Sequence, residues 1–162
     1  MLAGQAEIAG WSTRFDVDSQ VWTVIAPDGT CLQADLNDAE THAALLEHLE
    51  QALHEHVRGR LRLIQAGSQA MTDIPDPYPS MINIASVQDL SQRTGLELDP
   101  VRFRGNLLID GLEPWAELDM VGERLAVGEI EIEVRARIRR CVATSINPVT
   151  AAKDADLPKA LF

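Results

Sequence analysis

The spacing of apolar residues in the first third of the chain predicts a β-hairpin followed by a helix. Asp28-Gly29 lies between two short runs of apolar and β-branched residues, and Asp-Gly in this context is a strong turn signal. We therefore expect a hairpin over residues 19–34. Apolar residues then recur at helical spacing up to Val57, with Asn37 or Asp38 as the N-cap, which predicts a helix.

A short strand, a loop and a second helix are expected in the middle of the chain. Leu61 and Leu63 alternate with Arg60 and Arg62, which predicts a short strand over residues 60–66. Prolines in residues 67–80 exclude a helix or a central strand there. Ser86 is followed three residues later by an aspartate, which is the spacing of a capping box, so a helix is expected from Ser86 to Gly95.

The last third of the chain has the pattern of β structure. Strands are expected at residues 103–109 and 125–127, each closed by a turn that contains glycine. The clearest alternation of apolar and charged residues lies in residues 129–139. It predicts a long, half-buried strand with one charged face. The tail from Lys153 has weak helical character.

Charge excludes several classes of partner. The 162 residues include 14 Lys and Arg against 25 Asp and Glu, which gives a net charge of −11. Nucleic acids and anionic membranes attract basic surfaces, so neither is expected as a partner. Residues 1–101 hold 5 basic and 15 acidic side chains, whereas residues 102–140 hold 7 arginines and 8 acids. The second region is therefore the one where an anionic ligand could bind.

The sequence favours a cytoplasmic protein. No apolar run approaches the roughly 20 residues that cross a bilayer, and the start lacks the features of a secretory signal. The two cysteines, Cys31 and Cys141, are too few for a disulfide framework, although a bridge between them stays open. The four histidines lie on the first predicted helix but share no face, which favours solvated positions over a metal site.

Cys141 is the strongest candidate for chemistry, because four arginines precede it closely, at positions 135, 137, 139 and 140. Guanidinium groups favour a reactive thiolate, and they also bind phosphate well. One cysteine beside several arginines could hold a soft metal together with an anionic organic group. The alternative is a small buried cysteine at a strand end, with the arginines paired to the glutamates of residues 129–133.

Four motifs follow one another between residues 60 and 150. They are Thr72-Asp73 with Pro75 and the segment Ser80-Met81-Ile82-Asn83-Ile84-Ala85-Ser86-Val87; Phe103-Arg104-Gly105-Asn106; Pro114-Trp115-Ala116-Glu117-Leu118-Asp119 with Val121-Gly122; and Arg140-Cys141-Val142-Ala143-Thr144 with Asn147-Pro148. In this order they resemble the MOSC domain, the C-terminal module of molybdenum-cofactor sulfurases and of stand-alone bacterial relatives.

The resemblance implies a mainly β, barrel-like domain with a few helices, an α+β fold. Residues 1–58 would be its divergent N-terminal part and residues 59–162 its core. Cys141 would be the metal ligand or the sulfur carrier, working with molybdenum cofactor (molybdopterin). The residues implied around the cofactor are Arg104, Asn106, Arg140, Thr144 and Asp119. The chain would act in a molybdenum-dependent reductase or a sulfur-transfer system. Its partners would be an electron-donor or sulfur-donor protein and a small-molecule substrate, and its oligomeric state stays open.

The chain also departs from the family pattern. Gly105 stands where the family often has proline, and Asn147 stands where an acid is common. Family members usually continue past the cysteine motif into further strands, so we expect a core cut short at its last strands. These departures keep a second hypothesis open, a degenerate binding or assembly module. No pyridoxal-phosphate-dependent half is expected in 162 residues.

Overall fold

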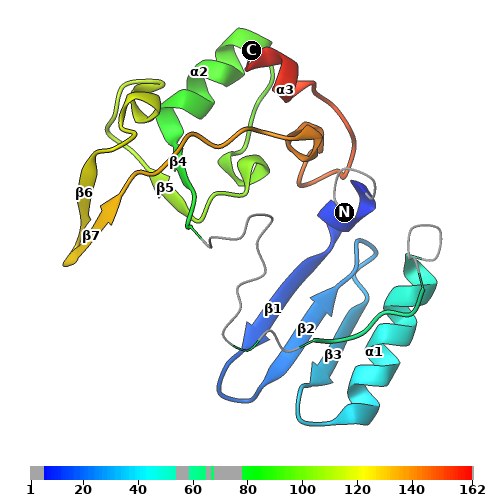
Figure 1. The fold of residues 1–162 in the computed structure, drawn as a ribbon. Helices are drawn as coiled ribbons and strands as arrows, with labels where there is room; N and C mark the ends of the chain where they lie inside the picture. Colours follow the sequence, from blue (N-terminus) through cyan, green and yellow to red (C-terminus); the bar gives the residue numbers. More distant parts are fainter. Residues whose placement is uncertain (1–5, 54–58, 65–66, 68–77, 162) are drawn as a thin grey trace. The chain divides into compact units, whose positions relative to one another are not determined.

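The computed structural model describes residues 6–53, 59–64, 67 and 78–161, and the chain divides into two compact units (Figure 1). The first unit comprises Met1–Pro75 with Asn147–Lys153, and the second comprises Asp76–Ile146 with Asp154–Phe162. The division at residue 58 that the resemblance implies stays a prediction. No helix in the described part of the chain is long and apolar enough to cross a membrane.

The first unit contains an antiparallel sheet of three strands and a helix. After η2 (Ala6–Gly10), the strands β1 (Ser12–Asp16), β2 (Val21–Ile25) and β3 (Cys31–Asp35) pair in sequence order, and α1 (Ala39–Ala52) packs on the sheet beside β3 (Figure 1). The predicted hairpin is confirmed. The predicted cap is also confirmed, because the Asp38 carboxylate accepts a hydrogen bond from the Glu40 N–H at 2.9 Å. Val24, Ala34 and Leu45 form the buried core of this unit.

The first unit also differs from the sequence-based expectations. It contains β1, which the sequence pattern does not predict and whose residues are all exposed. α1 ends at Ala52 instead of near Val57, and residues 54–58 lie outside the described residues. The predicted strand over residues 60–66 is wrong for residues 60–64, because no described strand pairs with them. Residues 65–66 and most of the predicted loop over residues 67–80 lie outside the described part.

The second unit packs short elements around one apolar cluster. Its elements are β4 (Met81–Asn83), α2 (Ile84–Thr94), η3 (Pro100–Phe103), β5 (Leu107–Ile109), η4 (Ala116–Asp119), β6 (Arg124–Val127), β7 (Ile130–Glu133), η5 (Val142–Ser145) and α3 (Leu157–Ala160). β4 and β5 are parallel, and β6 and β7 are antiparallel. The buried cluster consists of Ile82, Val87, Leu90, Leu98, Phe103 and Leu157. The short α3 agrees with the helical character predicted for the tail.

α2 begins earlier than the capping-box pattern predicts. Asn83 is its N-cap instead of Ser86, because the Asn83 side chain accepts a hydrogen bond from the Ala85 N–H at 3.1 Å. The Ser86 hydroxyl is buried and donates to the carboxylate of Glu117. The predicted end at Gly95 is confirmed, since Gly95 has a left-handed φ of 69°.

Two predicted strands are shorter than expected, whereas the strand predicted at residues 125–127 is confirmed as β6. Residues 103–109 begin as a turn, because Arg104 has a left-handed φ of 53°, and only Leu107–Ile109 pairs with β4. The alternating segment 129–139 pairs with β6 only over Ile130–Glu133. Alternation determines which side chains share a face, but it does not determine how long the partner strand is. Ile138 is 52% exposed, so the far end of this segment is not half-buried.

The α+β class is confirmed, but the barrel-like arrangement is not. The described strands lie in three separate sheets, with the orders β1-β2-β3, β4-β5 and β6-β7. A closed barrel gives every strand two neighbours. Among the described strands only β2 has two neighbours, so these sheets do not close.

Candidate functional site

Cys141 lies where an exposed segment enters the buried turn η5. It is the N-cap of η5 in an extended conformation, and its side chain makes no capping hydrogen bond. The backbone N–H and the hydroxyl of Thr144 donate to the Cys141 carbonyl oxygen at 3.2 and 2.9 Å. Cys141 is a free cysteine and an exposed residue, as is Cys31. The interpretation of Cys141 as a buried apolar residue is therefore wrong, and the two cysteines are not bridged.

Arg140 brings a positive charge to this thiol. Its Nη1 donates a hydrogen bond to the carbonyl oxygen of Phe103 at 3.2 Å, and its side chain is half-buried. Burial lowers the pKa of the Arg140 guanidinium, whereas the negative charge of a Cys141 thiolate raises it. Arginine stays protonated in proteins, so the guanidinium remains a cation that interacts with the sulfur.

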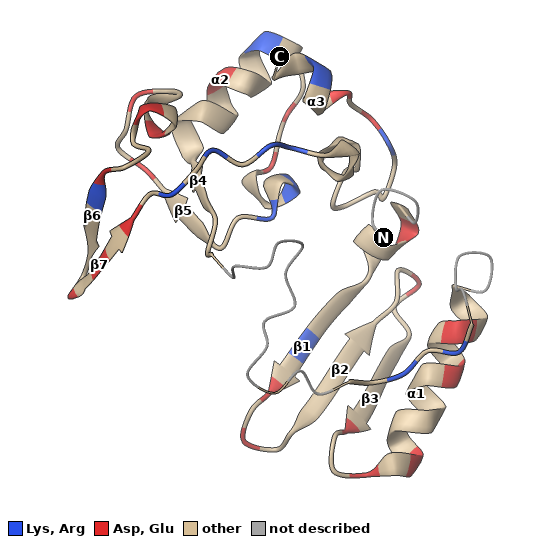
Figure 2. Cartoon of the chain, in the orientation of Figure 1, with Lys and Arg blue, Asp and Glu red and all other residues tan. Residues whose placement is uncertain are grey.

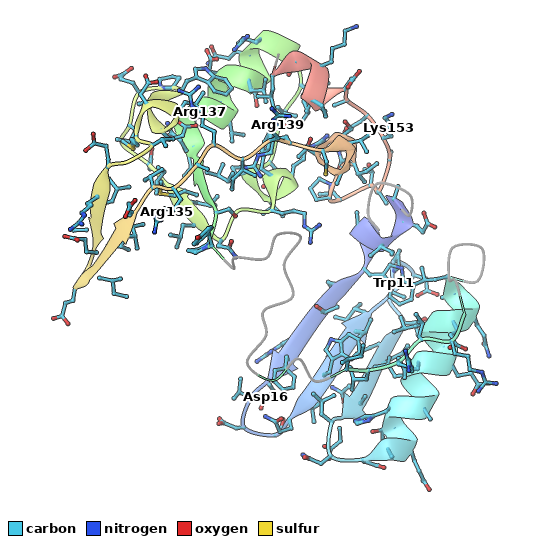
Figure 3. The ribbon with its side chains drawn as sticks, in the orientation of Figure 1. Trp11, Asp16, Arg135, Arg137, Arg139 and Lys153 are labelled. Atoms are coloured by element: carbon cyan, nitrogen blue, oxygen red, sulfur yellow. The ribbon has the colours of Figure 1, made fainter. Side chains whose placement is uncertain are left out.

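Three more arginines lie along the segment between β7 and η5, where Figure 2 shows blue positions and Figure 3 labels the side chains. Arg135 pairs with Glu133 at 3.2 Å. Arg137 donates to the Leu118 carbonyl oxygen at 2.7 Å. Arg139 is exposed and has no hydrogen bond or ion pair with another described residue. Pairing with strand glutamates therefore accounts for Arg135 but leaves Arg139 available.

The structure gives Arg104 and Asn106 different roles. Arg104 is exposed in the left-handed conformation, and its guanidinium has no partner among the described residues. The Asn106 side-chain oxygen accepts hydrogen bonds from the N–H and the hydroxyl of Ser80 at 2.8 and 2.9 Å. Asn106 therefore connects the start of β5 to the start of β4, whereas Arg104 remains available for a ligand.

Asp119 bonds to the chain before Cys141, and Thr144 follows Cys141 within η5. Asp119 has a side chain that is 89% exposed, and it pairs with Arg137 at 3.2 Å. Thr144 is buried within η5 and has its hydroxyl on the Cys141 carbonyl oxygen. Of the residues predicted around the cofactor, Thr144 bonds to the Cys141 carbonyl oxygen and Arg140 interacts electrostatically with Cys141. Asp119 pairs with Arg137, which lies four positions before Cys141.

The sequence interpretation missed Arg102. Its side chain is only 2% exposed, and it forms a bidentate pair with Asp154 at 2.6 and 3.0 Å. Its Nη1 also lies 3.5 Å from the Thr144 carbonyl oxygen. One signal that could have revealed it is an arginine placed directly between two apolar residues, Val101 and Phe103.

The residue types at Cys141 and at the nearby arginine motifs fit the cofactor that the resemblance implies. An exposed thiolate is a ligand that soft metals prefer, and guanidinium groups without partners bind phosphate. Arg104 and Arg139 are exposed and unpartnered among the described residues, and Arg140 interacts with the sulfur. The described residues contain no group of three or more His, Cys, Asp or Glu that could hold a metal. A metal here would have Cys141 as its protein ligand, with the other ligands supplied by the cofactor.

Comparisons with known proteins support the motifs. The family model of the MOSC domain matches residues 75–161, slightly more than half of the chain. The chain is 32% identical over 107 residues to "Molybdenum cofactor sulfurase" of Caenorhabditis elegans, covering 64% of this chain and 15% of that protein. It is 30% identical over 103 residues to "Molybdenum cofactor sulfurase" of Caenorhabditis briggsae, covering 62% of this chain and 14% of that protein. The alignments thus span about one seventh of each curated relative. The chain belongs to the MOSC domain family.

Proposed function

We propose that this chain acts in molybdenum-cofactor chemistry, with Cys141 binding the cofactor or carrying sulfur for it. The observation that carries the proposal is the free, exposed Cys141, which interacts electrostatically with the half-buried guanidinium of the preceding residue, Arg140. The name of the two relatives, molybdenum cofactor sulfurase, joins sulfur transfer to this cofactor. We further propose a cytoplasmic location and an electron-donor or sulfur-donor protein as partner.

In the cofactor-binding version, the Cys141 thiolate is the protein ligand of molybdenum. Arg104, Arg139 and Arg140 bind the anionic part of the cofactor, because their guanidinium groups suit phosphate oxygens. When bound, the cofactor would supply redox chemistry for the removal of an oxygen atom from a small-molecule substrate. The chain itself holds the sulfur at the surface. The Thr144 hydroxyl fixes the backbone there by donating a hydrogen bond to the Cys141 carbonyl oxygen.

In the sulfur-carrier version, the Cys141 thiolate attacks the outer sulfur of a donor persulfide. A new S–S bond forms at Cys141 while the S–S bond of the donor breaks, and the donor leaves as a thiolate. The exchange needs no external oxidant, because one sulfane sulfur moves from one thiol to another. The Arg140 cation then stands beside the newly formed persulfide.

Protein purified from cells supplied with molybdate distinguishes the two versions. Molybdenum content and the mass of the Cys141 peptide are measured on the same sample. Stoichiometric molybdenum supports cofactor binding, and a gain of one sulfur atom, about 32 Da, supports the carrier. Treatment with a thiol reductant is the control, because it removes a persulfide but leaves a sulfinic acid of nearly equal mass.

Absence of both molybdenum and sulfur would contradict both versions. The remaining function would be a binding or assembly module without chemistry. One observation favours that function, since two of the residues that the family resemblance assigns to the pocket are engaged within the chain. Asn106 bonds to Ser80, and Asp119 pairs with Arg137.

A further inference from the structure

Two neighbouring residues of η3 contact the chain on both sides of Cys141. The Nη1 of Arg102 donates to the carbonyl oxygen of Thr144 at 3.5 Å, three positions after the cysteine. The carbonyl oxygen of Phe103 accepts a hydrogen bond from Arg140 at 3.2 Å, one position before the cysteine. η3 therefore holds the backbone on one side of the thiol and the cation on its other side.

Arg102 is itself fixed by an ion pair with Asp154, whose side chain is 34% exposed. Its two terminal nitrogens donate to the two carboxylate oxygens of Asp154 at 2.6 and 3.0 Å, and its side chain is 2% exposed. This bidentate contact fixes the plane of the guanidinium as well as its charge, which a lysine could not do. The orientation of Nη1 toward the Thr144 carbonyl oxygen follows from that plane.

Asp154 and Phe103 connect this pair to the rest of the second unit. The Asp154 N–H donates to the Ser145 carbonyl oxygen at 3.2 Å, so Asp154 contacts both Arg102 and the end of η5. Phe103 is buried in the same apolar cluster as Leu157 of α3. The turn that begins at Cys141 is thus held at Thr144 and Ser145 by residues that the core positions.

Attraction to Asp154 alone does not explain a buried arginine at this place. Burial removes water from the Arg102 guanidinium, and this desolvation offsets part of its attraction to the partly exposed Asp154. An apolar side chain would leave the carbonyl oxygen of buried Thr144 without the donor that Arg102 provides. The geometric contribution of Arg102 is therefore a defined position for η5.

We propose that Arg102, paired with Asp154, is a positioning residue that keeps the Cys141 thiol exposed beside Arg140. The proposal rests on the function assigned to Cys141 above. Arg102 lies outside the four family motifs. In this proposal the ion pair sets the position of the thiol and does not itself contact a ligand.

The test measures how strongly Cys141 prefers an anionic alkylating reagent. In a C31S background Cys141 is the remaining thiol of the chain. The alkylation rates with iodoacetate and iodoacetamide are measured on the same sample, and their ratio is taken. The thiolate fraction cancels in this ratio, which therefore reports the cation beside the sulfur. R140Q sets the lower limit, with an expected fall of about three- to fivefold for the loss of one nearby charge.

R102K and D154N decide the proposal. R102K keeps the charge but loses the bidentate contact, and we expect the ratio to fall toward the R140Q value. D154N removes a negative charge, which would raise the ratio if only long-range electrostatics acted, whereas loss of positioning lowers it. R124K is the matched control, because it alters an exposed pair with Glu131 and should leave the ratio unchanged.

Circular dichroism establishes whether each variant is folded. One folded variant, either R102K or D154N, is sufficient to decide the proposal. An unchanged ratio in folded R102K or a raised ratio in folded D154N would overturn the proposal and leave the pair with a structural role alone. The ratio does not depend on any cargo. Failure of this test is therefore distinguishable from an absence of molybdenum or sulfur on Cys141.

Discussion

Replacement of Gly105 by alanine tests the packing that places β5 beside β4. A Cβ atom at Gly105 would overlap Cγ1 of Ile82 and would lie 3.3 Å from its Cβ. Ile82 is 7% exposed in the core cluster, and its strand pairs with β5. A β-branched side chain is stiff at χ1, so Ile82 cannot turn away without leaving its rotamer or displacing its neighbours. G105A therefore forces a shift between the two strands next to Arg104 and Asn106.

The magnitude follows from two opposing effects. Overpacking of a core costs about 1–3 kcal/mol. The φ angle of Gly105 lies outside the left-handed region, so alanine adds no backbone strain there. Alanine also restricts the unfolded chain, which stabilises the folded state by about 0.4–1 kcal/mol. We expect a net loss of about 1–2 kcal/mol, which lowers Tm by about 4–16 °C for a unit of this size.

Urea unfolding of G105A in three backgrounds measures this conflict. The backgrounds are wild type, I82V, which keeps the γ-carbon that alanine would meet, and I82A, which removes it. The cost of G105A should persist with I82V and should disappear or become a small gain with I82A, because the two sites are coupled by direct contact. An equal cost of G105A with valine and with alanine at position 82, or no cost in wild type, would refute the reasoning.

Three further predictions concern strain, buried polar groups and pH. Arg104 has a left-handed φ of 53°, which costs a non-glycine residue about 1–2 kcal/mol, so R104G should keep or raise Tm in thermal unfolding while weakening cofactor retention; a large fall in Tm would contradict this. Glu117 accepts a hydrogen bond from fully buried Asn83 at 2.9 Å, so E117A should lower the unfolding free energy by about 1–3 kcal/mol in urea titrations, and a neutral result would argue against the contact. The backbone N–H and then the hydroxyl of Ser19 hold the pKa of Asp16 below its usual value of 3.8. This contribution to stability is present above the unfolded pKa and is lost as the pH falls through the lower folded pKa. S19A should raise the pKa of Asp16 only partway toward 3.8 in an NMR titration, because the N–H remains.

The parts of the fold that depend on local signals could be predicted from the sequence. The hairpin around Asp28-Gly29, the Asp38 cap of α1 and the Gly95 cap of α2 all follow from residue types within a few positions. β1 could not be predicted, because its residues are all exposed and its strand forms by pairing with β2. The length of β7 likewise depends on β6, which offers it only four paired positions.

The candidate site shows the same difference between local and distant information. Cys141 and Arg140 are adjacent in the sequence, so their electrostatic interaction follows from the motif itself. Arg102 pairs with a residue 52 positions later, and no spacing rule connects the two. A buried arginine can be interpreted only when the partner that neutralises it is known.

The most direct test of the account compares the two cysteines of the same chain. Both thiols are free and exposed, but Arg140 interacts with Cys141. Wild type, C31S and C141S are purified from molybdate-supplied cells, and the molybdenum or persulfide sulfur retained per chain is measured. The account predicts that C31S retains the wild-type amount and that C141S loses it. An equal amount retained by C141S would contradict the claim that Cys141 is the functional centre.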